Sequence, residues 1–163
     1  MSPADARAAL IQAESMRDWA AVKAHLTKAR SVDPADGDAE SALVALSLSL
    51  SLSLSLDHAY QAFETILVRL ERAVGLPERV GVSWHTALLA DAALDLQGVR
   101  PPVFPPQSLG DWDALLRFRH FLRHAYVTSL DPARLAANVE RLEAAVVATD
   151  AWLTAVLTAL RTV

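Results

Sequence analysis

The residues best suited to chemistry lie in one cationic and aromatic segment, residues 117–126, of an otherwise acidic chain rich in leucine and alanine. Within this segment Arg119, His124 and Tyr126 form the pattern Arg-x4-His-x-Tyr. An arginine is always charged and presents a fork of donors that fits phosphate oxygens. A histidine can give or take a proton near neutral pH. The pattern therefore indicates a minimal apparatus for cleaving a phosphodiester bond.

A helix through this segment would have two polar faces. One face holds Arg117, His120 and His124, and the other holds Arg119, Arg123 and Tyr126. Arg119 and His124 would lie about 140° apart on a regular helix, so Arg117 is geometrically the easier partner for the histidine. We expect Arg117, His120 and Arg123 to support substrate binding. The alternative without chemistry is a solvated basic helix face.

Other kinds of site have less support in the sequence. His120 and His124 have the i, i+4 spacing of metal ligands, but the chain has no His-Glu-x-x-His pattern and no third ligand at a telling spacing. It also has no cysteine, and none of its five glycines stands in a Gly-x-Gly arrangement. We therefore expect neither a metal nor another cofactor.

The bulk composition favours one globular domain over residues 1–163, since 53% of the residues are hydrophobic and 21% are charged. The net charge of -4 argues against a broad nucleic-acid surface, so RNA would bind a local basic patch. The longest apolar stretch, residues 43–56, is interrupted by serines and is shorter than the roughly 20 residues of a membrane span. No secretory signal is visible. The expected protein is soluble, cytoplasmic and not bound to a membrane.

Helix signals recur along the chain and strand signals are nearly absent. We expect an all-α, up-and-down bundle of about five helices, at residues 3–30, 38–74, 84–96, 109–129 and from 132 almost to 163. Four prolines exclude a helix at residues 100–106, where Val103 and Phe104 are of the type that anchors a loop in the core.

Serine and leucine alternate between residues 46 and 56. Strict alternation is formally a strand pattern, but both flanks are rich in helix formers, so a helix is expected. Leucines two apart then step by about 200° and form two stripes on nearly opposite sides. This helix would be central, or shared with a partner subunit. A repeat expansion that the fold tolerates explains the run equally well.

Two further pairs of residues suggest packing rather than catalysis. Tyr60 and Glu64 are one helical turn apart, which suits a buried tyrosine with a polar partner. Trp84 and His85 are expected to anchor the third helix in the core.

The segment from residue 56 to 126 resembles the HepT-like toxins, members of the HEPN superfamily of α-helical ribonucleases. The residues that show the likeness are Leu56, Tyr60, Glu64, Ile66, Trp84-His85, Leu88-Leu89, Gly98-Val99-Arg100-Pro101, Phe118-Arg119-His120 and Arg123-His124-Ala125-Tyr126. The outer helices agree only in being helical. Residues 57–59, Asp-His-Ala, depart from the family, which has an asparagine-type residue before the long-helix tyrosine, and the Ser-Leu run is not a family feature.

The resemblance implies a HEPN-like fold and the toxin of a two-component toxin–antitoxin pair, with a small nucleotidyltransferase as antitoxin. It assigns metal-independent RNA cleavage to Arg119 and His124 at a homodimer interface. It also assigns AMP transfer by the antitoxin to Tyr126. In a dimer, one site can draw residues from both chains.

Two functions of other classes stay open. One is a non-catalytic helical interaction module that binds a nucleotidyltransferase partner through the leucine stripes. The other is a substrate-binding helper domain for a nucleotidyltransferase that works on small molecules.

Overall fold

The computed structural model describes residues 2–32, 42–124 and 130–160. In these ranges the chain forms five α-helices and one short 3₁₀ turn. They are α1 (Pro3–Arg30), α2 (Ala42–Ala73), α3 (Trp84–Ala92), η2 (Pro106–Ser108), α4 (Leu109–His124) and α5 (Pro132–Ala159). The same ranges contain no strand, only an isolated bridge between Leu96 and Arg100. The expected all-α bundle is confirmed.

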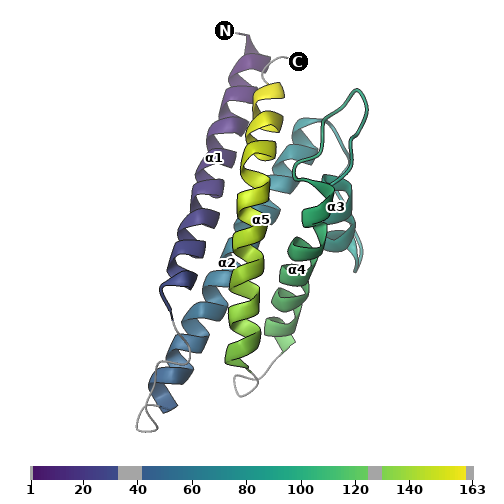
Figure 1. Cartoon of the computed structure of the whole chain (residues 1–163). Coiled ribbons are helices and arrows are strands. Elements are labelled where there is room, and N and C mark those ends of the chain that lie inside the picture. Colours follow the sequence, from purple (N-terminus) through teal and green to yellow (C-terminus); the bar gives the residue numbers. More distant parts are fainter. Residues whose placement is uncertain (1, 33–41, 125–129, 161–163) are drawn as a thin grey trace.

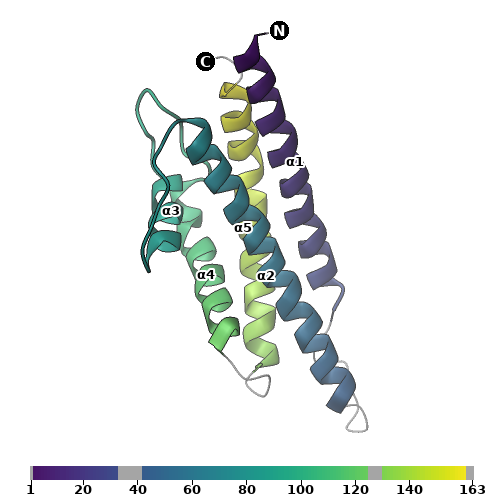
Figure 2. The same cartoon turned by 180° about the vertical axis from the view of Figure 1, so that it is seen from behind.

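The four longer helices lie along the molecule and alternate in direction, so that α1 and α4 run one way and α2 and α5 the other (Figure 1). The short α3 packs beside α4 and α2, away from α1 (Figure 2). The first turns of α2 extend beyond the end of α1. This arrangement places α3 and α4 together on one side of α2, where the candidate site lies.

Local sequence explains where the outer helices begin. At the start of α1, Ser2 and Asp5 form a capping box in which each side chain accepts a backbone hydrogen bond from the other residue. At the start of α5, the carboxylate of Asp131 accepts from the backbone N–H of Ala133. Each cap is followed by a proline, whose fixed φ suits a first helical turn.

Aromatic side chains fill the centre of the bundle. The rings of Phe63 in α2 and Trp112 in α4 stack at 3.7 Å, and Phe104 lies 5.9 Å from Phe63. Phe104 and its neighbour Val103 are buried, so the loop of residues 100–106 is anchored in the core as expected. Because Trp112 contacts residues from several elements, this stack fixes α4 relative to α2.

The third helix is shorter than predicted: it ends at Ala92, and residues 93–96 are not helical. The chain instead forms a tight turn in which Leu96 and Arg100 exchange backbone hydrogen bonds. Gly98 has a φ of +74° in this turn, a conformation that glycine adopts without strain. Gly98 therefore serves the turn and not the end of the helix.

The Ser-Leu run is helical, as expected, and its two leucine stripes differ. Leu52 and Leu56 are buried, whereas Leu54 is 55% exposed. The buried hydroxyl groups of Ser53 and Ser55 donate to backbone carbonyls one turn earlier, which satisfies them within the helix. One leucine stripe thus faces the core of the chain and the other faces solvent.

Two of the described helices, Leu43–Ala73 and Pro132–Ala159, are long and apolar enough to cross a membrane by length and composition. The apolar stretch of residues 43–56 was expected to be too short for a membrane span, but the helix that contains it is long enough. One or two such helices are a weak indication, because the core helix of a soluble protein passes the same test.

Candidate functional site

A buried polar cluster joins α2, α3 and α4, and Glu64 of α2 lies at its centre. One carboxylate oxygen of Glu64 accepts a hydrogen bond from Nη1 of Arg119 in α4 at 3.0 Å. The other carboxylate oxygen lies 2.5 Å from Nδ1 of His85 in α3. Glu64 is 7% exposed and Arg119 is 6% exposed. The two ends of one carboxylate therefore fix a guanidinium and an imidazole in place.

Arg119 has two further neighbours on α2. Its Nε lies 3.3 Å from a carboxylate oxygen of Asp57, and its guanidinium lies over the ring of Tyr60, 5.8 Å from the ring centre. The Nε–Asp57 contact is an ion pair without hydrogen-bond geometry, so this buried N–H has no acceptor among the described residues. Arg119 is thus compensated by two carboxylates, and its buried Nε–H has no acceptor among the described residues.

His85 extends the cluster toward His120 of α4. Its ring stacks on Trp84 at 3.7 Å and meets the ring of His120 edge-on, with the ring centres 5.6 Å apart. A carboxylate can only accept, so the proton of a neutral His85 is on Nδ1, and Nε2 is left as an acceptor. Burial lowers the pKa of His120, as do the positive charge that His85 carries when it is protonated and the positive charge of Arg119. His120 is therefore predominantly uncharged at neutral pH.

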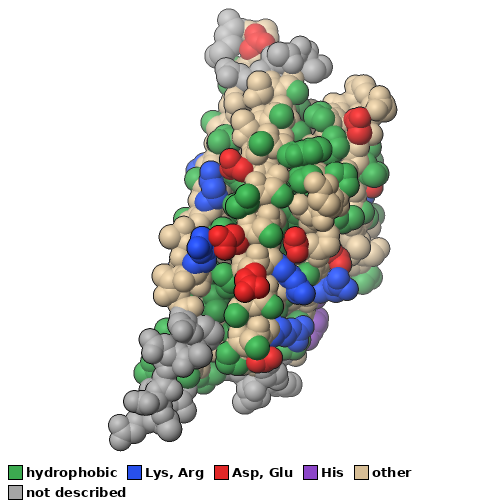
Figure 3. Space-filling model, in the orientation of Figure 1, with side chains coloured by type: hydrophobic (Ala, Val, Ile, Leu, Met, Phe, Trp, Pro, Cys, Tyr) green, Lys and Arg blue, Asp and Glu red, His purple; other side chains and the backbone are tan. Residues whose placement is uncertain are grey.

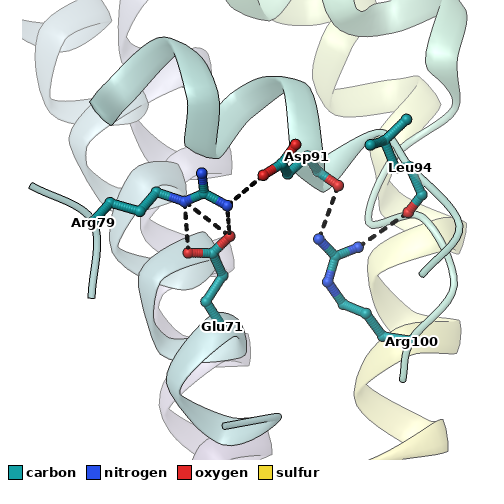
Figure 4. A network of polar contacts seen from close by, with 5 residues as sticks. All are labelled: Glu71, Arg79, Asp91, Leu94 and Arg100. Carbon is teal, nitrogen blue, oxygen red and sulfur yellow. Dashed lines mark hydrogen bonds and ion pairs between the residues drawn. The ribbon is translucent and has the colours of Figure 1, made fainter. Parts of the chain in front are cut away.

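A second polar network holds α3 against α2 (Figure 4). Arg79, in the loop between the two helices, donates to both carboxylate oxygens of Glu71 in α2 and to Asp91 in α3. Arg100 donates to the backbone carbonyls of Asp91, in the last turn of α3, and of Leu94, just after the helix. These contacts attach the C-terminal end of α3 to α2 and to the loop that follows it, and α3 is the helix that carries His85.

The motif residues occupy different surroundings within one chain. His124 and Arg123 are exposed in the last turn of α4. Arg117 is exposed on the same helix and forms an ion pair with Asp113 at 2.7 Å. Arg119, by contrast, is buried against α2, whereas His124 is exposed to solvent. Tyr126 lies outside the described residues.

Sequence reasoning did not find the partners of Arg119. Glu64 is 55 residues away from Arg119 along the chain, and His85 is 21 residues from Glu64. The expectation of a buried tyrosine is confirmed, since Tyr60 is 1% exposed. The role of Glu64 as the junction of three helices has no local signal, because it depends on helix packing. Among the described residues no group of three His, Asp or Glu side chains could hold a metal ion.

The burial of Tyr60 leads to a titration experiment. Burial, and then the charge of Glu64, raises the pKa of Tyr60 well above its ordinary value of 10.0. In a Tyr126→Phe variant, which keeps Tyr60 as the one tyrosine, tyrosinate absorbance should therefore appear only when the protein unfolds. Because the unfolded chain loses this proton near pH 10, stability should fall as the pH rises above that value. Reversible ionisation of the folded variant near pH 10 would contradict the burial.

Comparison with known proteins gives one family. A family model described as "HepT-like protein" matches residues 51–160. This range begins in the middle of the Ser-Leu run of α2 and extends to the end of α5. No curated protein and no solved structure matches the chain.

Proposed function

The chain belongs to the HepT-like family of the HEPN superfamily, and we propose that it is the toxin of a toxin–antitoxin pair and cleaves RNA without a metal ion. The observation that carries the proposal is the match over residues 51–160, because this range includes the whole Arg-x4-His-x-Tyr pattern together with Glu64 and His85.

In the proposed reaction a 2′-hydroxyl group loses its proton and its oxygen forms a bond to the neighbouring phosphorus, while the bond from that phosphorus to the 5′-oxygen of the next nucleotide breaks and this oxygen takes up a proton. His124 removes this proton or protonates the leaving 5′-oxygen, which suits its exposed position. Arg119 stabilises the charge that develops on the phosphate, because its guanidinium is always positively charged. Arg117 and Arg123 add positive charge from the surface of α4.

The proposal includes two partners. A second copy of the chain would form a homodimer in which Arg119 and His124 of different chains share one site; the different burial of the two residues within one chain supports this arrangement. A nucleotidyltransferase antitoxin would transfer AMP to Tyr126. The added phosphate would place a bulky anion beside the motif, where it repels and displaces an RNA phosphate.

The first test compares the chain with its His124→Ala variant in a growth assay and in cleavage of purified RNA. Loss of a general acid or base lowers the rate by about 10²-fold or more, and growth arrest should be relieved in parallel. A His124→Ala variant that cleaves RNA as fast as the parent would exclude this role. His25→Ala is the matched control, because His25 lies in α1, outside the family match.

The antitoxin is tested by intact mass after co-expression with a small nucleotidyltransferase. The parent chain should gain one or more AMP groups, and Tyr126→Phe should gain none. An AMP gain that persists in Tyr126→Phe would place the modification elsewhere.

A second candidate, the non-catalytic interaction module, is supported by an apolar row on α2. Leu43, Leu46, Leu50 and Leu54 share one helix face, and Leu43 and Leu54 are 82% and 55% exposed. A nucleotidyltransferase that binds the parent chain but not a Leu43→Glu, Leu54→Glu variant, together with no RNA cleavage by the parent, would favour this candidate.

A further inference from the structure

A groove of about 270 Å³ lies between α4 and α5, and three arginines line it. Arg117 comes from α4, and Arg134 and Arg141 come from α5. Figure 3 shows basic side chains, drawn in blue, gathered where these two helices adjoin, with a histidine at the edge of the group. Neither α4 nor α5 contains a lysine, so the basic side chains of these two helices are arginines. Such a concentration of positive charge contrasts with the net charge of -4 for the chain.

The positive charge of the groove is only partly compensated. Asp113 is the one described carboxylate in an ion pair with any of the three arginines, and its partner is Arg117. Arg134 lies over the ring of Phe121, with 4.2 Å between its guanidinium carbon and the ring centre. This contact holds the guanidinium at the groove without neutralising it. The groove therefore suits an anion, and arginine forks fit phosphate oxygens in particular.

The side chain of Asn138 adds a second, independent feature. Asn138 lines the same groove and is 2% exposed. Its Nδ2 donates to the carbonyl of Arg134, but its Oδ1 is buried with no hydrogen-bond partner in the described part of the chain. An unpaired buried acceptor destabilises the fold. A hydroxyl or amino donor on a ligand would satisfy it.

We propose that this groove binds the sugar–phosphate backbone of single-stranded RNA, with the arginines on phosphate and Asn138 accepting from a 2′-hydroxyl group. This inference rests on the proposed ribonuclease function and names where its substrate is held. Arg117 and His124 are seven residues apart on one face of α4, about 10 Å along the helix. An RNA strand that lies in the groove and continues along this face of α4 therefore reaches His124.

The test measures RNA binding by the His124→Ala protein, which holds its substrate without cleaving it. Binding of a fluorescent single-stranded RNA is followed by anisotropy over a range of salt concentrations. In the Arg134→Gln, Arg141→Gln variant, two phosphate contacts are lost, so the slope of log K against log salt should fall by about 1.4. An Arg7→Gln, Arg17→Gln variant on α1 changes the net charge equally, and its salt slope should equal that of the His124→Ala protein.

Three outcomes separate the inference from the function on which it rests. A groove variant with the same salt slope as the parent would overturn the inference, even when the wild-type chain cleaves RNA. A wild-type chain that neither binds nor cleaves RNA would overturn both the groove inference and the proposed ribonuclease function. For Asn138→Ala, the preference for RNA over DNA of the same sequence should decrease. An unchanged preference would remove Asn138 from the site, and thermal melting confirms that each variant is folded.

Discussion

Replacing Trp112 with alanine is expected to lower the free energy of unfolding by about 3–5 kcal/mol. The indole is fully buried, stacks on Phe63 at 3.7 Å and donates from Nε1 to the hydroxyl of Thr149 in α5 at 3.1 Å. Its removal leaves a cavity at the point where α2, α4 and α5 meet. Chemical denaturation at a fixed protein concentration measures the loss.

The control for this prediction is Trp152→Ala. Trp152 is 39% exposed, so its removal leaves no enclosed cavity and should change the free energy of unfolding by much less. Trp112→Phe keeps an aromatic ring against Phe63 but loses the donor to Thr149, and its effect should lie between the two. A Trp112→Ala protein as stable as the parent would show that this stack does not hold the helices together.

The helices could be predicted where local chemistry decides them. Ser2 and Asp131 cap the outer helices with their own side chains, and each is followed by proline, so both starts were visible in the sequence. The end of α3 could not be predicted in this way. Residues 93–96 are mostly helix formers, but Arg100 binds the carbonyls of Asp91 and Leu94 and closes the chain into a turn. This contact depends on the tertiary position of the proline-containing loop.

In the candidate site, too, features set by local sequence could be predicted, and features set by tertiary packing could not. The motif residues of α4 could be identified because they are close in sequence and their spacing on a helix is regular. The burial of Arg119 could not be, because it results from Glu64 and Asp57 on another helix. The α4–α5 groove was not predictable either: Arg117 was identified in the sequence, but the proximity of Arg134 and Arg141 to it follows only from the packing of α5 on α4.

Replacing Glu64 with alanine is expected to lower the free energy of unfolding by about 3 kcal/mol, because it leaves the buried guanidinium of Arg119 with one partner fewer. The hydrogen bond that orients His85 is lost at the same time. Denaturant midpoints measure the effect. Glu140→Ala, which removes an exposed carboxylate from α5, should change stability by no more than about 0.5 kcal/mol. Equal stability of the two variants would contradict the central position of Glu64.

A double variant separates the electrostatic role of this pair from its packing. Glu64→Leu with Arg119→Met replaces both buried charges by apolar side chains, which removes the cost of an uncompensated guanidinium. The double variant should therefore recover most of the stability that Glu64→Ala loses. The double variant should not cleave RNA, because the proposed reaction needs the guanidinium of Arg119. If the double variant stays as unstable as Glu64→Ala, the contact of Glu64 with His85 accounts for the loss, and the Glu64–Arg119 pair is not what stabilises the packing of α4 on α2.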